Sequence, residues 1–228
     1  MAPDDVKALV GTLTQFTAAK IPVITVDTDV YQHSARLGNI TSDNPLGGKL
    51  AEQYFAQHLP AGSQVVYVGE PPGISTTDQR EQGFVNAVKS SSLKDLTPQF
   101  GTDDDPNTAT ALVSALIQRN PNIKGIFASD TSWGQGAATA VQNAGKTGQI
   151  KIVAFDAEPA EVQGLQRGTI QALIVQKAYQ EGIDAVTYAV NYIRHHTPVP
   201  AETNPPYVVA TKANVNTPAV QKYVYAQK

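Results

Sequence analysis

The chain has 228 residues, no cysteine and a formal net charge of −3. This length is enough for one large α/β domain or for two lobes that each bury a core. The absence of cysteine excludes disulfides, thiolate metal sites and cysteine nucleophiles. The mildly acidic balance argues against nucleic acid or an anionic membrane surface as a partner, and no apolar run approaches the roughly 18 residues of a membrane span.

Short runs rich in β-branched residues alternate along the chain with segments of helical periodicity. The predicted strands are 21–27, 34–40, 64–69, 95–100, 123–129, 150–156, 171–176 and 207–212. The clearest predicted helices are 5–19, 45–58, 76–89, 107–119, 134–144 and 179–195. This alternation predicts an α/β protein with doubly wound parallel sheets, in which ligands bind beyond the carboxyl ends of the strands.

The loop after the predicted strand 64–69 reads Gly69-Glu70-Pro71-Pro72-Gly73. A glycine-rich loop between a strand and a helix can cradle a phosphate with backbone N–H groups. Here two of the residues after Gly69 are prolines, which have no N–H to donate, and neither GxGxxG nor Gly-Lys-Ser/Thr is present. This sequence pattern disfavours a Rossmann-type nucleotide enzyme. From this stretch alone, a loop that only turns the chain is at least as good an interpretation as a phosphate-binding loop.

Polar residues follow nearly every predicted strand. The candidates are Asp27, Arg80, Asp104, Asp105, Asp130, Asp156 and Gln176. Any one aspartate after a strand is more often a helix N-cap than a ligand contact. As a set, one hydrogen-bonding group per strand end with no strong nucleophile suits a hydroxyl-rich ligand.

The remaining chemistry-bearing residues support no catalytic or metal site. Trp133, the single tryptophan, is either an apolar platform for a ligand ring or, more often for a lone aromatic, core filling. The acidic segment 102–107 lacks the spacing of an EF-hand calcium loop. The four histidines fall on loops or helix ends. The prediction is therefore a binding protein rather than an enzyme, with no cofactor and no metal.

Six segments together resemble the ribose-type periplasmic sugar-binding proteins, substrate-binding components of ABC transporters. They are 19–30, 38–55, 73–84, 120–130, 150–176 and 207–216. The resemblance covers essentially the whole chain and implies a two-lobe type I periplasmic-binding fold, with the ligand held between lobes joined by three crossovers. It also implies that the loop after residue 68 leads a ligand-binding arginine into the cleft.

The resemblance carries over to individual positions. Asp27, Arg80, Asp156 and Gln176 match family residues that contact the sugar. The chain departs from the ribose-binding pattern at three others: Thr28 replaces a second arginine, Asp130 an asparagine, and Asp104 an aromatic ring. These departures argue against ribose itself as the ligand.

The resemblance also implies an organisation in lobes. Residues 1–42 and 177–206 are expected to form the N-terminal lobe, and 43–176 with 207–228 the C-terminal lobe. Family members carry a strand and two βα units, roughly 60 residues at about 30 per unit, before the segment that matches the start of this chain. The first lobe is therefore expected to be truncated at its N-terminus.

The predicted function is solute binding for an ABC sugar-uptake system, by hinge closure around a small neutral sugar or polyol. Several carboxylates beside one arginine accept hydrogen bonds from hydroxyl groups and repel anionic sugars. The expected partner is the transporter permease, with membrane contact only through it. The expected location is periplasmic or extracytoplasmic, although Met1-Ala-Pro-Asp-Asp does not read as an export signal. The alternative is the effector domain of a lactose-repressor-type regulator.

Overall fold

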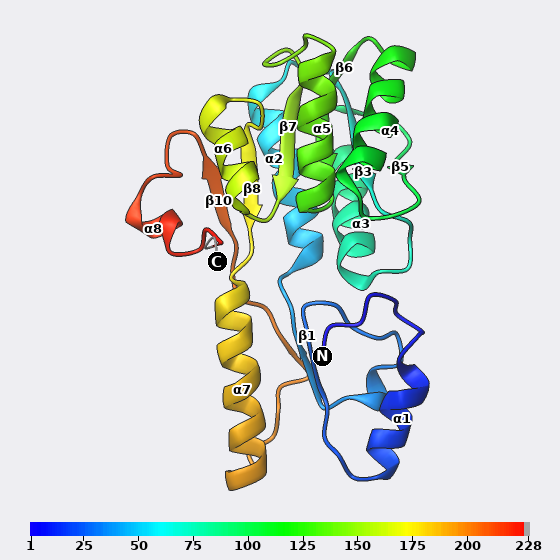
Figure 1. Cartoon of the computed structure of the whole chain (residues 1–228), viewed down its shortest axis with the longest axis vertical. Coiled ribbons are helices and arrows are strands. Elements are labelled where there is room, and N and C mark those ends of the chain that lie inside the picture. The colour runs from blue at the N-terminus through cyan, green and yellow to red at the C-terminus, as the bar shows by residue number, and fades with distance from the viewer. Residues whose placement is uncertain (226–228) are drawn as a thin grey trace.

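The structure, a computed structural model, describes residues 1–225 of the chain. Figure 1 shows two bodies of unequal size joined by segments of chain that run between them. The small lobe contains α1 (Val10–Ala18), β1 (Ile24–Val26), the 3-10 helix η1 (His33–Ala35), β2 (Gly38–Ile40), α7 (Ala178–His195) and β9 (Glu202–Thr203). Its sheet has the strand order β1-β2-β9, and both strand pairs are parallel.

The large lobe is built on a seven-stranded sheet. Its strands are β3 (Gln64–Gly69), β4 (Lys94–Asp95), β5 (Gln99–Phe100), β6 (Ile123–Ala128), β7 (Lys151–Phe155), β8 (Ala172–Val175) and β10 (Val208–Thr211). Its helices are α2 (Asn44–His58), α3 (Ser75–Lys89), α4 (Pro106–Arg119), α5 (Thr131–Asn143), α6 (Pro159–Arg167) and α8 (Pro218–Gln221). The strand order is β10-β8-β7-β6-β3-β4, with β5 also paired to β3.

The sheet of the large lobe is buried on both faces. Along β3, Val66 and Val68 point into one hydrophobic core, whereas Val65 and Tyr67 point into a second. This alternation follows from the two-residue period of a strand. Helices α4 and α5 cover the first core, and α2 and α3 cover the second. The doubly wound arrangement predicted from the sequence is therefore confirmed.

Two predicted elements differ from the structure for identifiable reasons. The first helix begins at Val10 rather than near Asp5, because the Asp5 carboxylate accepts the N–H groups of Lys7 and Ala8 in a separate turn. The predicted strand 95–100 is split into β4 and β5 around Pro98, which has no N–H for the ladder.

Other differences concern short or unusual elements. The segment 34–40 contains η1 before β2, and β10 pairs with β8 in antiparallel orientation. Helices α6 and α8 and strand β9 were not predicted. The sequence does carry a signal for α6, because Glu158 and Glu161 form a reciprocal capping box at its start.

Candidate functional site

Arg80 is a buried cation held by three elements. Only 3% of the residue is exposed, although it lies on helix α3. Its Nε donates to Asn44 Oδ1 at 2.9 Å, and its Nη1 donates to the carbonyl oxygen of Ser129 at 2.8 Å. The guanidinium carbon lies 3.8 Å from the centroid of the Phe155 ring. Because these contacts come from α2, the end of β6 and the end of β7, they fix the guanidinium plane.

Two of the predicted aspartates, Asp27 and Asp156, stabilise the positive charge of Arg80. Burial alone would lower the pKa of Arg80, but the carboxylates of Asp156 and Asp27 outweigh it and raise that pKa. Burial raises the pKa of Asp27, and the Arg80 guanidinium offsets part of that increase. The three side chains therefore form one electrostatic cluster, although Asp27 belongs to the small lobe and the other two to the large lobe.

Both aspartates follow a parallel strand in an unusual backbone conformation. Asp27 has φ +63° and Asp156 has φ +76°, in the left-handed region that aspartate tolerates better than most residues. Such strained positions concentrate at sites that hold ligands. Oδ1 of Asp27 is buried and has no hydrogen-bond partner within residues 1–225. The local conformation therefore presents an acceptor that another molecule can satisfy.

Gln176 ends the β8 run and is 8% exposed. Its Nε2 donates to Asp156 Oδ1 at 2.8 Å, so this predicted pair is brought together. The hydroxyl of Tyr225 donates to the same oxygen at 2.7 Å. Oε1 of Gln176 is buried and, in the part of the chain that the structure describes, accepts no hydrogen bond.

Asp130 and Asp105 cap helices, as an aspartate after a strand commonly does. The Asp130 carboxylate accepts the N–H of Trp133 at 3.1 Å and a short hydrogen bond from the Ser129 hydroxyl. The Asp105 carboxylate accepts the N–H of Asn107 at 2.7 Å. Asp130 is half-buried beside the Arg80 contact at Ser129, whereas Asp105 is exposed. Capping does not use every lone pair of Asp130, so its predicted ligand role stays a prediction.

Trp133 is fully buried in the core between the sheet and helices α4 and α5. A methyl group added at Gly101 would come within 2.6 Å of its ring, which shows how closely the loop after β5 packs on the indole. These contacts fit the core interpretation of this residue. A role in ligand binding stays a prediction.

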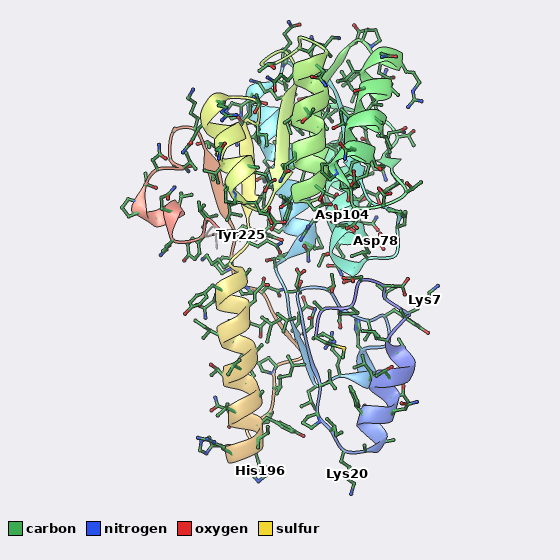
Figure 2. The ribbon with its side chains drawn as sticks, in the orientation of Figure 1. Lys7, Lys20, Asp78, Asp104, His196 and Tyr225 are labelled. Carbon is green, nitrogen blue, oxygen red and sulfur yellow. The ribbon has the colours of Figure 1, made fainter. Side chains whose placement is uncertain are left out.

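Asp104 is exposed at the end of the large lobe that faces the small lobe, where Figure 2 labels it. Its negative charge adds to the effect of burial on the pKa of Glu70, which lies in the Gly69-Glu70-Pro71-Pro72 loop. Burial, together with the charges of Asp130 and Asp104, raises the pKa of Glu70 to about 7. The loop between β3 and α3 therefore adds a further acid to this edge of the sheet.

A polar cavity of about 260 Å³ lies between the ends of β1 and β2 and the start of α3. Its lining includes Asp27, Asn39, Thr41, Ser75, Asp78 and Gln79. Two hydrogen bonds also join the lobes in this region: Val6 N–H donates to Gly73 O at 3.1 Å, and Asp29 N–H donates to Ser75 Oγ at 2.7 Å. Asp27 thus lies at an interface where the two lobes are in direct contact.

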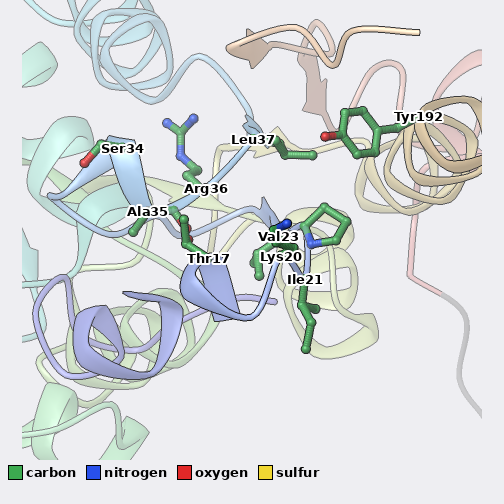
Figure 3. Close-up of a pocket in the computed structure, with 10 residues that line it drawn as sticks. Thr17, Lys20, Ile21, Val23, Ser34, Ala35, Arg36, Leu37 and Tyr192 are labelled. Carbon is green, nitrogen blue, oxygen red and sulfur yellow. The ribbon is translucent and has the colours of Figure 1, made fainter. Parts of the chain in front are cut away.

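A second cavity, of about 240 Å³, lies within the small lobe and is shown in Figure 3. It is lined by Lys20, Arg36, Leu37 and Tyr192 among others. None of the residues predicted from the strand ends lines it. Within residues 1–225 no group of three or more His, Cys, Asp or Glu side chains is placed to hold a metal ion, and no helix is long and apolar enough to cross a membrane.

Three residues of the site were not predicted from the sequence. Asn44, Glu70 and Tyr225 lie within contact or charge range of Arg80, Asp130 and Asp156 respectively. Glu70 follows a strand directly, so the strand-end rule could have found it. Asn44 begins α2, and Tyr225 belongs to the segment after α8; neither position carries a local signal of a ligand site.

Comparison with known proteins gives a consistent result. A model of the "periplasmic binding protein domain" matches residues 1–197. The chain is 31% identical over 187 residues to the ribose import binding protein of Salmonella typhimurium, covering 82% of this chain and 62% of that protein. It is 30% identical over 207 residues to a D-ribose/D-allose-binding protein of Pseudomonas aeruginosa, covering 87% and 63% respectively. The chain thus spans less than two thirds of the length of these curated relatives.

Two solved structures superpose on almost the whole chain. An ABC transporter solute-binding protein of Agrobacterium vitis, bound with α-D-tagatopyranose, is 36% identical with a TM-score of 0.94, over 99% of this chain and 78% of that chain. A carbohydrate transporter solute-binding protein of Agrobacterium radiobacter, in complex with D-arabinose, is 27% identical with a TM-score of 0.89, over 98% and 77%. These likenesses confirm the predicted α/β fold of the type I periplasmic-binding class.

Proposed function

The chain belongs to the family of periplasmic binding protein domains, and on this basis we propose that it binds the solute of an ABC sugar-uptake system. The ligand class that we propose is a small neutral sugar or polyol. The repressor alternative has less support, because the relatives described above are import and transporter binding proteins by name. We further propose binding without catalysis, an extracytoplasmic location, and a permease as the partner that receives the solute.

The observation that carries this proposal is the buried guanidinium of Arg80 in one cluster with Asp27 and Asp156. The planar fork of an arginine suits two adjacent hydroxyl or ring oxygens, and carboxylates accept hydrogen bonds from neighbouring hydroxyl groups. Solved relatives support the same ligand class, since the bound sugars named for them, tagatose and arabinose, are neutral. The arrangement has one cation for several acids, which disfavours an anionic sugar.

We infer that ligand binding works by closure of the two lobes on each other. Asp27 comes from the small lobe, whereas Arg80 and Asp156 come from the large lobe, so a ligand that touches all three holds the lobes together. The lobe boundaries that we propose are those predicted from the sequence, with crossovers near residues 42, 176 and 206. The ligand contacts proposed at Asp104, Asp105, Asp130, Trp133 and Gln176 belong to the same hypothesis.

A thermal-shift panel tests the proposal. The probes are ribose, allose, tagatose, arabinose and fucose, with sugar phosphates and uronic acids as the charged comparison. A ligand at about 100 times its Kd stabilises the folded state by about 2.7 kcal/mol, which corresponds to a rise in Tm of about 5–10 °C for a chain of this size. Selective stabilisation by a charged sugar contradicts the ligand class, and no shift with any probe contradicts sugar binding by the chain.

A further inference from the structure

The segment after α8 docks on the loop that carries Asp156. The hydroxyl of Tyr225 donates to Asp156 Oδ1 at 2.7 Å, and the backbone N–H of Tyr225 donates to Ala157 O at 3.1 Å. The two residues are 69 positions apart in the sequence. Figure 2 labels Tyr225 at the junction of the two lobes, near the start of α7. A side chain from the end of the chain therefore reaches the candidate ligand site.

Asp156 Oδ1 accepts two hydrogen bonds from different directions. One comes from Gln176 Nε2 at 2.8 Å and the other from the Tyr225 hydroxyl at 2.7 Å. Neither of these two hydrogen bonds uses the second carboxylate oxygen, Oδ2. Two donors on one oxygen restrict rotation of the carboxylate, and neither of them occupies Oδ2. This matters at a residue with φ +76°, because the backbone there does not hold the side chain in an ordinary strand geometry.

The tyrosine is suited to this role chemically. Burial, then the neighbouring Asp156 carboxylate, raises the pKa of Tyr225 well above its ordinary range. The phenol therefore keeps its proton at neutral pH and acts as a donor to the carboxylate. A phenylalanine in its place would fill the same volume but leave Oδ1 with a single donor.

The docked segment is also held beside the crossover between β8 and α7. Lys177 Nζ lies 4.9 Å from the centroid of the Tyr223 ring. Residues 176–179 and 222–225 together line one cavity of about 250 Å³. The segment thus contacts both Asp156 and the part of the chain that connects the lobes.

We propose that Tyr225 is a positioning residue of the sugar site, which fixes Asp156 so that Oδ2 faces the ligand. The ligand part of this inference rests on the proposed function. The last described residues of the chain would then belong to the site. Tyr225 does not follow a strand, so the strand-end rule does not predict this role.

A double-mutant cycle tests the contact without any ligand. The variants are Tyr225→Phe and Asp156→Gly, since glycine adopts φ +76° without strain; the control is Tyr223→Phe, in the same segment. Tyr225→Phe is expected to lower the urea midpoint in the wild-type background and to leave it unchanged in the Asp156→Gly background. Tyr223→Phe is expected to change neither. Equal effects of Tyr225→Phe in both backgrounds would overturn the inference, because a purely structural role of the ring gives no coupling.

Calorimetry with tagatose, arabinose, allose and ribose tests the role in binding. Tyr225→Phe is expected to weaken the affinity for the sugar that binds by about threefold to tenfold, the usual worth of one hydrogen bond, and to have no further effect in Asp156→Gly. Wild-type affinity in Tyr225→Phe overturns the positioning role. If the wild-type chain binds none of these sugars, the proposed function fails instead, and the urea cycle still decides whether Tyr225 holds Asp156.

Discussion

Replacement of Arg80 by lysine tests the site because it keeps the positive charge and removes the planar fork. Arg80 makes two hydrogen bonds at once, to Asn44 Oδ1 and to Ser129 O, and stacks on Phe155. A lysine has one nitrogen on a flexible stem and cannot reproduce this pair of directions. One of the two acceptors therefore loses its partner in Arg80→Lys.

The expected loss of stability in Arg80→Lys follows from the burial of the two acceptors. Asn44 is 1% exposed and Ser129 is fully buried, so water cannot replace the lost donor. A hydrogen bond from a charged donor contributes about 1.5–3 kcal/mol, and we expect Arg80→Lys to lower the free energy of unfolding by that amount. On the proposed function the affinity for the sugar should fall as well, because the fork that we propose as a ligand contact is no longer held.

The assay is urea unfolding followed by the fluorescence of Trp133, which is the only tryptophan and is fully buried. Arg119→Lys is the matched control, since Arg119 is exposed at the end of α4. Calorimetry with the sugar found in the panel supplies the second measurement. If Arg80→Lys unfolds with the same free energy as Arg119→Lys and binds the sugar equally well, the planar fork of Arg80 contributes neither to stability nor to binding.

Two further predictions follow from the same site. Burial raises the pKa of Glu181 to about 7 despite its hydrogen bond from Ser42. The folded state therefore binds the proton of the Glu181 carboxyl more tightly than the unfolded state does. The contribution of Glu181 to the unfolding free energy consequently falls as the pH rises from about 4.5 to 7. Glu181→Gln should reduce that slope in urea titrations at about pH 5 and pH 8, and an unchanged slope would contradict the assignment. Gly48→Ala should lower the urea midpoint, because its methyl group would lie 2.1 Å from Arg80 O and 2.5 Å from Phe84 N, both backbone atoms of α3. A wild-type midpoint for Gly48→Ala would show that α2 and α3 separate easily.

The sequence was sufficient to predict the residues whose position depends on the period of the sheet. Asp156 and Gln176 each end a run of buried residues in neighbouring parallel strands, whose carboxyl ends meet at one edge of the sheet. Asp27 follows the half-buried strand β1 of the other sheet, so only the strand-end position predicts it. The structure brings Asp156 and Gln176 into contact and places Asp27 within charge range of Arg80. Their proximity could be predicted, whereas their use as ligand contacts is a proposal that the binding assays decide.

The residues that were missed depend on contacts between distant segments. Asn44 holds Arg80 across 36 positions, and Tyr225 holds Asp156 across 69. Which side chain of α2 meets α3 is set by the close approach of two glycines, Gly48 and Gly83, whose added methyl groups would each lie 2.1 Å from the other helix. A periodic pattern predicts that two helices pack, but the choice of facing residues follows from this local geometry.

The acceptors that remain at the site favour a hydroxyl-bearing ligand over an anion. Oδ1 of Asp27 and Oε1 of Gln176 are buried without a partner among residues 1–225. A buried acceptor without a donor costs about 1–3 kcal/mol, so a ligand that donates to it gains correspondingly. A hydroxyl group can donate to these oxygens and accept from the Arg80 fork, whereas a phosphate or carboxylate can only accept. An anionic group placed at Arg80 could donate to neither acceptor and would add a negative charge beside Asp27 and Asp156.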